Sequence, residues 1–180
     1  MFALVLLASL HLSAPPISAL AVMDDTGVAR RPMELGPAKA AVFIFVEVEC
    51  PISNSYAPEI NRIIGDYSAK GINFYMVYPE SGLTADQVKQ HTAAYGYHCP
   101  ALMDADHLLV NLFHVAVTSQ SVVVGADGKV LYNGRIDDLY VDFGKKRFAA
   151  TAHELRDALD AVAGDRPVAT PATKAVGCPI

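Results

Sequence analysis

The chain has 180 residues, of which 52% are hydrophobic and 18% are charged, so it has ample apolar material for one packed domain and is not disordered as a whole. Its formal net charge is −5 and Lys and Arg form no extended run, which argues against the basic surface typical of proteins that bind nucleic acid. We therefore expect a protein or small-molecule partner and no nucleic acid.

The first 21 residues predict a signal peptide. An apolar stretch runs from Phe2 to Leu12, and Ala19-Leu20-Ala21 suits a cleavage site of small residues. No Lys or Arg precedes the apolar stretch, although such signals normally begin with one, so an uncleaved anchor and a mis-assigned start stay open as alternatives. Cleavage after Ala21 would export the protein to the periplasm or beyond, where disulfides persist, and no later segment is long enough to span a membrane.

Residues 22–40 are rich in turn-forming residues and predict a short hairpin or an irregular lead-in. The stretch 41–46 is continuously apolar, which indicates a strand buried on both faces. A second apolar strand is predicted over 71–78, and 51–70 between them has apolar residues at helical spacing. The three segments form a β-α-β unit, and its strands are therefore parallel.

The second half of the chain predicts further helices and strands of an α/β fold. Thr84 with Gln87, and Thr151 with Glu154, have the spacing of capping boxes that begin helices. The predicted elements are a helix over 84–94, a strand over 101–103, a helix over 107–113, a hairpin of strands 121–125 and 129–132, and a helix from 151 to 164. Pro, Ala and Thr then dominate, so the chain divides into a signal peptide (1–21), a domain (22–164) and a flexible tail (165–180) that carries Cys178.

Cys50 is the strongest candidate for chemistry. If Pro51 is the first helical residue, Cys50 is the N-cap, and its sulfur lies beside unpaired backbone N–H groups that stabilise a thiolate. The thiolate is the species that attacks disulfides and peroxides. Glu47 and Glu49 lie on one face of the strand end, and a carboxylate close to the sulfur would raise the pKa of the thiol. The alternative is a buried cysteine without chemistry.

The apolar strand ends in Phe45 five residues before Cys50, the motif Cys50-Pro51-Ile52-Ser53 begins the helix, and Pro58 follows eight residues after Cys50. These residues resemble the thioredoxin-like superfamily, and within it the bacterial redoxin or AhpC/TSA-like branch. Cys50-Pro51-Ile52-Ser53 stands where thioredoxins have Cys-x-x-Cys, and Pro58 has the place of the proline that kinks the first helix of that family. The resemblance covers roughly residues 22–164 and implies a central mixed β-sheet flanked by helices.

The sequence also departs from that family at three positions. Ser53 replaces the second cysteine, so the helix cannot close its own disulfide. Ser119 stands where the family has a cis-proline, which argues against peptide docking there, and Glu47 stands where peroxiredoxins have a threonine, which argues against peroxidase chemistry. Cys178 in the tail could be the resolving thiol, as C-terminal cysteines are in some redoxin relatives. The alternative for Cys178 is a free thiol or one that pairs between molecules.

The remaining cysteine and histidines predict no further site. Cys99 precedes a short strand and is expected to be a packed cysteine. Its neighbour His98, with His107 and His114, has the spacing of no strong zinc pattern, so we expect no metal at this cluster. No cofactor is expected either.

The sequence therefore favours an exported thiol–disulfide oxidoreductase. In this hypothesis Cys50 attacks a protein disulfide or a small peroxide, the Ser53 hydroxyl donates to the thiolate, and Cys178 resolves the product. One alternative is a non-catalytic thioredoxin-like interaction domain, which the missing second cysteine and cis-proline favour. Another is a copper-handling protein like the Sco-type chaperones, in which Cys50 with Cys178 or a nearby His would bind Cu(I).

Overall fold

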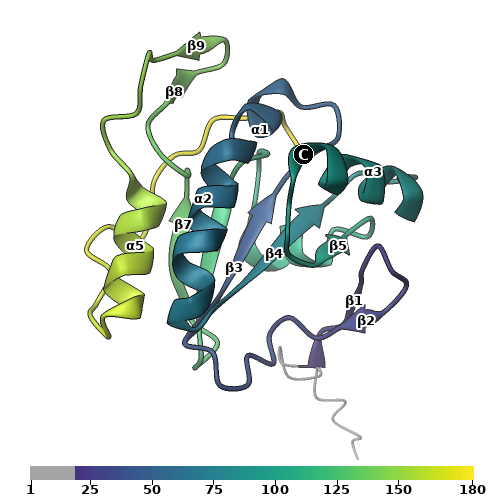
Figure 1. Ribbon diagram of the computed structural model, residues 1–180, viewed down its shortest axis with the longest axis horizontal. Helices are drawn as coiled ribbons and strands as arrows, with labels where there is room; N and C mark the ends of the chain where they lie inside the picture. The colour runs from purple at the N-terminus through teal and green to yellow at the C-terminus, as the bar shows by residue number, and fades with distance from the viewer. Residues whose placement is uncertain (1–18) are drawn as a thin grey trace, which may run out of the picture.

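A computed structural model describes residues 19–180, so the predicted signal peptide lies almost wholly outside the described residues. The centre of the fold is a five-stranded sheet with the strand order β5-β4-β3-β6-β7 (Figure 1). The strands β3 and β4 are parallel, as are β4 and β5, whereas β6 runs antiparallel to both β3 and β7. Their bounds are β3 (Ala40–Phe45), β4 (Ile72–Tyr78), β5 (Ala101–Met103), β6 (Ser121–Gly125) and β7 (Val130–Gly134). The predicted central mixed sheet is confirmed.

The strand β3 forms the middle of the hydrophobic core, and all six of its residues are buried. Val42 and Ile44 belong to the core layer on one face of the sheet, whereas Phe43 and Phe45 belong to the layer on the other face. Successive side chains of a strand point to opposite faces, so a strand covered on both sides needs apolar residues at every position. This explains the unbroken apolar run in the sequence.

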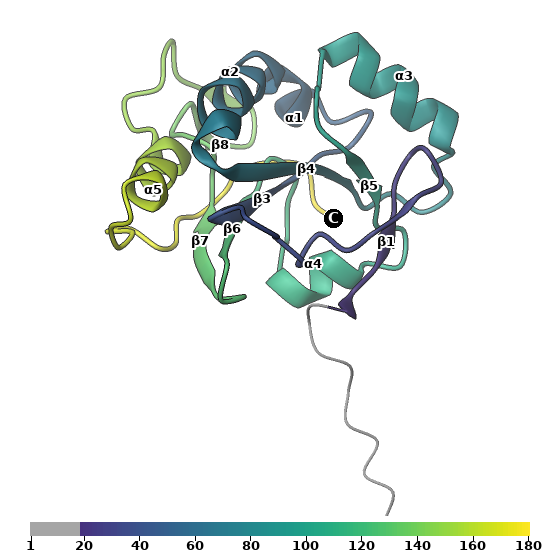
Figure 2. The ribbon, with the colours of Figure 1, turned by 60° about the horizontal axis from the view of Figure 1, so that its bottom comes forward.

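Helices cover both faces of the sheet (Figure 2). On one face, Ile60 and Ile63 pack with Leu155 and Leu159 in the same core layer as Val42. The opposite face is covered by a single short helix and by the lead-in. The helices of the first face are α1 (Pro51–Ser55), α2 (Ala57–Tyr67), α3 (Ala85–Tyr95) and α5 (Glu154–Ala163), and a 3₁₀ turn (Ser68–Lys70) follows α2. The helix of the other face is α4 (Leu108–Phe113). The lead-in contains the hairpin of β1 (Val22–Met23) and β2 (Ala29–Arg30).

Two helix starts show how far the local sequence patterns hold. The capping box of Thr84 and Gln87 is present at the start of α3, as predicted. The predicted capping box of Thr151 is wrong, because α5 begins only at Glu154 and the Thr151 hydroxyl donates to the Asp138 carboxylate at 2.6 Å. A buried carboxylate that needs donors competes with the helix end for this hydroxyl. The sequence analysis also missed the hairpin of β8 (Tyr140–Asp142) and β9 (Lys145–Lys146).

The segment 165–180 packs along the sheet instead of forming the flexible tail that the sequence predicted. It runs from the end of α5 past β7 to the end of the sheet near α1 (Figure 1). Asn133 in β7 donates its N–H to the carbonyl of Pro171 at 2.9 Å and accepts the N–H of Thr173 at 3.2 Å. The strand β7 is the edge of the sheet, and such an edge has free backbone groups that a neighbouring segment can pair. Within residues 19–180, no helix is long and apolar enough to cross a membrane.

Candidate functional site

Cys50 lies at the junction between the central strand and the first helix. The chain leaves β3 at Phe45, passes through five residues (46–50) and enters α1 at Pro51. Cys50 is the N-cap residue of α1, as predicted, with an extended backbone (φ −78°, ψ 110°) and Pro51 in the first turn. Its sulfur accepts the backbone N–H of Ser53 at 3.5 Å, and the residue is only 2% exposed. The junction therefore places the Cys50 sulfur where it accepts a backbone N–H from the first turn of α1, as the Cys-Pro sequence predicted.

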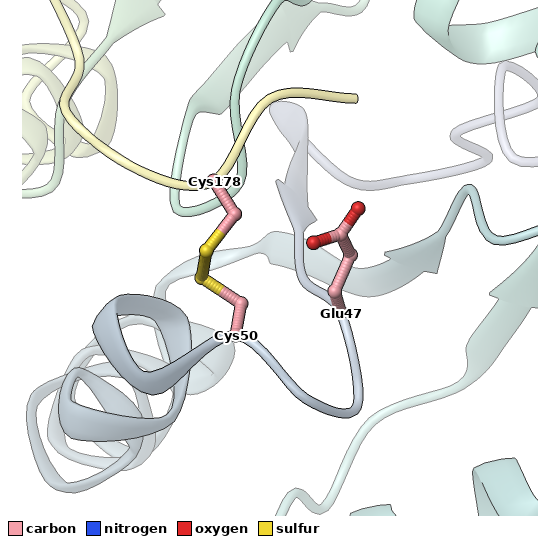
Figure 3. A group of neighbouring side chains, drawn as sticks. All are labelled: Glu47, Cys50 and Cys178. Carbon is pink, nitrogen blue, oxygen red and sulfur yellow. A yellow bond between two sulfur atoms is a disulfide. The ribbon is translucent and has the colours of Figure 1, made fainter.

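Cys50 forms a disulfide with Cys178 (Figure 3). The two cysteines are 128 positions apart in the sequence, and their Cα atoms are 6.1 Å apart, which lies within the usual range for a disulfide. The tail brings Cys178 to the site, where the Cys178 carbonyl accepts the N–H of Thr118 at 2.8 Å and the N–H of Ile180 donates to Ala116 at 3.1 Å. The structure thus contains the pair that the resemblance to redoxins implied.

Thr118 joins the two halves of the site, and the sequence analysis did not identify it. Its Oγ1 lies 3.0 Å from the Cys50 sulfur and accepts the N–H of Cys178 at 3.0 Å. The oxygen accepts the Cys178 N–H with a lone pair, so the hydroxyl proton is available to donate to the sulfur. Its place in the sequence is the one signal that could have identified it. Thr118 lies in the loop before β6 and precedes Ser119, which stands where the family has a cis-proline.

The Ser53 hydroxyl has a different role from the one predicted. It donates to the carbonyls of Glu47 and Cys50, each at 3.3 Å, and therefore closes the loop instead of contacting the sulfur. Serine in the first turns of a helix commonly bonds nearby backbone carbonyls in this way. Asn54 supports the same loop, because its amide donates to the carbonyl of Val48 at 2.9 Å.

A second layer of polar contacts holds Asn54 in place. Its Oδ1 lies 2.9 Å from Nε2 of His91, and Nδ1 of His91 lies 2.8 Å from the Tyr78 hydroxyl. His91 is 5% exposed, and burial lowers the pKa of its imidazole, which favours the neutral ring with one donor and one acceptor nitrogen. The loop before Cys50 is thus tied to α3 and β4.

Glu47 extends toward the disulfide from the loop after β3 (Figure 3). A carboxylate oxygen of Glu47 and the sulfurs of Cys50 and Cys178 all lie within 4.8 Å of one another. Burial raises the pKa of the Glu47 carboxyl group. This group is the one set of potential metal ligands found among the described residues, and only after reduction would its two sulfurs be thiolates able to bind a metal.

Glu47 also lines a pocket of about 320 Å³ beside the site, together with Glu49, Glu80 and Leu83. Burial raises the pKa of Glu80, and its proximity to Glu47 adds to the shift. Glu80 accepts the N–H of Val48 at 2.7 Å, so it also fixes the loop. The side of the site next to this pocket is therefore acidic.

Cys99, His107 and His114 take no part in the contacts of the site. Burial raises the pKa of the Cys99 thiol to about 12, so it is a thiol at neutral pH, and it pairs with neither of the other cysteines. His107 contacts the carbonyl of Pro79 through Nε2 at 2.9 Å, and His114 ends α4. Cys99 is thus the packed cysteine that the sequence predicted.

No family model matches the chain, and no curated protein matches it. Among solved structures, an uncharacterized conserved protein from Geobacillus kaustophilus is 25% identical, with 89% of this chain and 86% of that chain covered and a TM-score of 0.80. A secreted Mycobacterium tuberculosis disulfide oxidoreductase homologous to E. coli DsbE is 17% identical, with coverages of 83% and 97% and a TM-score of 0.57. A thioredoxin-like protein from Aeropyrum pernix is 17% identical, with coverages of 66% and 81% and a TM-score of 0.56. The chain has a thioredoxin-like fold.

The distinctive feature of this thioredoxin-like chain is the origin of its second thiol. The helix that begins after Cys50 has Ser53 where Cys-x-x-Cys proteins have the second cysteine, and the tail supplies Cys178 in its place. Arranged in this way, the site holds two cysteines that can cycle between dithiol and disulfide, with hydrogen-bond donors aimed at one of the two sulfurs.

Proposed function

We propose that this chain is an exported thiol–disulfide oxidoreductase of redoxin type, with Cys50 and Cys178 as its redox pair. The observation that carries the proposal is the disulfide between these residues at the strand-to-helix junction of a thioredoxin-like fold. The M. tuberculosis disulfide oxidoreductase homologous to E. coli DsbE, which has the same fold, supports the same reaction class.

The proposed reaction begins with the reduced protein. The Cys50 thiolate attacks a disulfide of the partner, forms a mixed disulfide and releases one partner thiolate. The Cys178 thiolate then attacks the Cys50 sulfur, which forms the Cys50–Cys178 disulfide and releases the second partner thiolate. Two electrons pass from the two cysteines to the partner, and the two released thiolates take up protons.

Contacts of the Cys50 sulfur support its role as the attacking group. The Ser53 N–H and the Thr118 hydroxyl both reach it, and hydrogen bonds to a charged form favour that form. A protein disulfide suits the site better than a small peroxide, because Glu47 stands where peroxiredoxins have their threonine. Glu47 adds negative charge beside the sulfur instead of a hydroxyl donor.

Export is part of the proposal. The apolar start of the chain and its Ala19-Leu20-Ala21 site support a signal peptide, and the M. tuberculosis protein of the same fold is described as secreted. A periplasmic or extracellular location suits a protein with a disulfide, because the cytosol keeps thiols reduced. Residues 22–164 then form the redoxin domain, to which the tail adds Cys178.

Trapping of a mixed disulfide tests this reaction. In a Cys99→Ser background, we expect Cys178→Ser to accumulate a mixed disulfide between Cys50 and a protein substrate such as insulin, because the resolving thiol is missing. Cys50→Ser is the matched control and should trap none. If the Cys178→Ser variant traps no substrate, or if Cys50 in reduced protein does not react with iodoacetamide at neutral pH, the proposed reaction is wrong and a non-catalytic interaction domain becomes the better hypothesis.

Copper handling is a second candidate, which the cluster of Glu47, Cys50 and Cys178 favours. After reduction it would offer two thiolates, the ligands that Cu(I) prefers. Competition with a Cu(I) chelator distinguishes the two functions, because a copper-handling protein must hold the ion when both cysteines are present and lose it in Cys178→Ser.

A further inference from the structure

The two cysteines of the disulfide differ in their exposure to solvent. Cys50 is 2% exposed and belongs to the hydrophobic core on the α2 face of the sheet. Cys178 is partly exposed in the tail segment, and its neighbour Pro179 is exposed. A thiol that approaches the oxidised protein from solvent therefore reaches Cys178 more readily than Cys50. Access is one of the factors that decide which sulfur of a disulfide is attacked.

The two sulfurs also differ as leaving groups. Attack on one sulfur of a disulfide expels the other as a thiolate, and the thiolate that is better stabilised leaves faster. The Cys50 sulfur already lies 3.0 Å from the Thr118 hydroxyl and 3.5 Å from the Ser53 nitrogen. Among residues 19–180, no comparable donor lies within hydrogen-bond distance of the Cys178 sulfur. Leaving-group stability and access thus favour the same direction of attack.

We infer that the reducing partner attacks Cys178, so that the tail cysteine carries the mixed disulfide with the reductant and Cys50 is expelled. The inference rests on the proposed function and names the residue through which electrons enter. A partner thiolate forms a bond with the Cys178 sulfur, the Cys50–Cys178 bond breaks, and its electron pair stays on Cys50 as a thiolate. A second thiolate of the partner then attacks the partner's sulfur in the mixed disulfide. This step forms a disulfide within the partner and releases Cys178 as a thiolate, which takes up a proton.

The two cysteines would then face different partners. Cys178 exchanges with the reductant while the tail covers Cys50, and Cys50 attacks the oxidised substrate once the bond to the tail is broken. The tail remains beside the site during the first step, because the backbone bonds of Thr118 with Cys178 and of Ile180 with Ala116 do not depend on the disulfide. A thioredoxin-like helix with a single cysteine can in this way separate its two half-reactions.

Mapping the first mixed disulfide tests the inference. Oxidised Cys99→Ser protein is mixed with glutathione at neutral pH, quenched after a short time with acid, treated with N-ethylmaleimide and analysed by peptide mass spectrometry. Acid stops further exchange because the attacking species is the thiolate. We expect glutathione on Cys178 and maleimide on Cys50 in at least about tenfold excess over the reverse pattern. Glutathione mainly on Cys50, or an equal distribution, would overturn the inference.

The same protein unfolded in urea is the control for intrinsic reactivity. Without the fold neither sulfur is shielded and the donors of Thr118 and Ser53 are lost, so the excess on Cys178 should fall toward an equal distribution. An excess that persists in urea would show that the preference belongs to the local sequence, and would also overturn the inference. Failure of the proposed function is recognised separately, because the protein would then form no disulfide, or its disulfide would react with no thiol, dithiothreitol included.

Discussion

The carboxyl group of Glu47 lies within 4.8 Å of both sulfurs of the pair, and it is the one carboxyl group in this cluster among the described residues. A negative charge at this distance disfavours a second one on sulfur. In surroundings close to water, two unit charges about 5 Å apart interact by roughly 1 kcal/mol, which corresponds to about a fivefold change in an equilibrium. The proposed thiolate of Cys50 would therefore form against the charge of Glu47.

Glu47→Gln should accordingly increase the reactivity of the pair. In reduced Cys99→Ser protein we expect Cys50 to react with iodoacetamide about fivefold faster at pH 7. Burial raises the pKa of Glu47, so the residue becomes neutral as the pH falls through that raised value, and the difference from Gln should then vanish. Rates measured from pH 4 to pH 8 check both statements.

The control is Glu49→Gln, which removes an exposed carboxyl group two residues away and should change the rate less. An equal effect of the two substitutions would contradict a specific role for Glu47.

At the residue scale, the sequence predicted what depends on near neighbours. The N-cap position of Cys50 follows from an apolar strand and the adjacent Pro51, so it could be predicted. Thr118 contacts Cys50 across 68 positions of sequence, and no local pattern marks that contact. The Ser53 hydroxyl was misassigned because its position in the first turn of α1 offers it backbone carbonyls as closer acceptors than the sulfur.

The end of the tail forms a short antiparallel pairing with the loop before β6. Val117 and Pro179 are partners in an isolated bridge, and the Thr118 N–H donates to the Cys178 carbonyl at 2.8 Å. Gly177 is buried at the closest approach of the two segments, where a Cβ would collide with the backbone carbonyl of Thr118. Only a residue without a side chain lets the tail reach Cys50.

Gly177→Ala should therefore weaken the disulfide. Overpacking against backbone costs about 1–3 kcal/mol, so we expect the equilibrium constant for closing the disulfide against glutathione to fall by about tenfold or more. The measurement is the fraction of oxidised protein in glutathione buffers of increasing oxidising strength. Gly65→Ala in α2 is the matched control, because a Cβ there would meet no atom within 4 Å, and it should leave the fraction unchanged. An equal oxidised fraction in the two variants would contradict the prediction, because the tail could then pack beside Cys50 without its close approach to Thr118.

At the element scale, the central elements were predictable and the later ones less so. The strand β3 and the capping box of α3 leave clear local patterns in the sequence. The start of α5 was misplaced because a distant partner, Asp138, takes the Thr151 hydroxyl. The hairpin of β8 and β9 is largely exposed, so it lacks the alternation of apolar and polar residues that identifies a half-buried strand.

The disulfide links two parts of the molecule that are 128 positions apart, and this affects the stability of the whole domain. A covalent link reduces the conformational freedom of the unfolded chain, and a loop of this length corresponds to about 4–5 kcal/mol in the loop-entropy description. We expect reduction of Cys99→Ser protein to lower the free energy of unfolding by about that amount, as measured by urea unfolding with and without reductant. The Cys178→Ser variant should have the free energy of unfolding of the reduced protein, and reductant should not change it. If reductant also lowers the free energy of unfolding of that variant, the effect has a cause other than this disulfide.

For the molecule as a whole, the order of strands and helices together with the resemblance to redoxins predicted the architecture. The path of the tail was not predicted, because its composition of Pro, Ala and Thr is the same in a flexible end and in a segment that pairs with a sheet edge. Its place is decided by partners in β7 and in the loop before β6, which the tail meets only in the folded chain.

The path of the tail has a consequence for a chain that is cut. The disulfide turns residues 50–178 into a covalent ring, and the exposed hairpin of β8 and β9, with Phe143 66% exposed, is a part of that ring open to proteases. A single cut there in oxidised protein leaves one covalent molecule in which both fragments stay tethered. The same cut in reduced protein produces two separate polypeptides, one of which carries α5, the tail and Cys178. The redox state of the pair therefore decides what a cut in this hairpin does. In the oxidised protein the fragment with Cys178 stays covalently attached to Cys50, whereas in the reduced protein no covalent bond holds it.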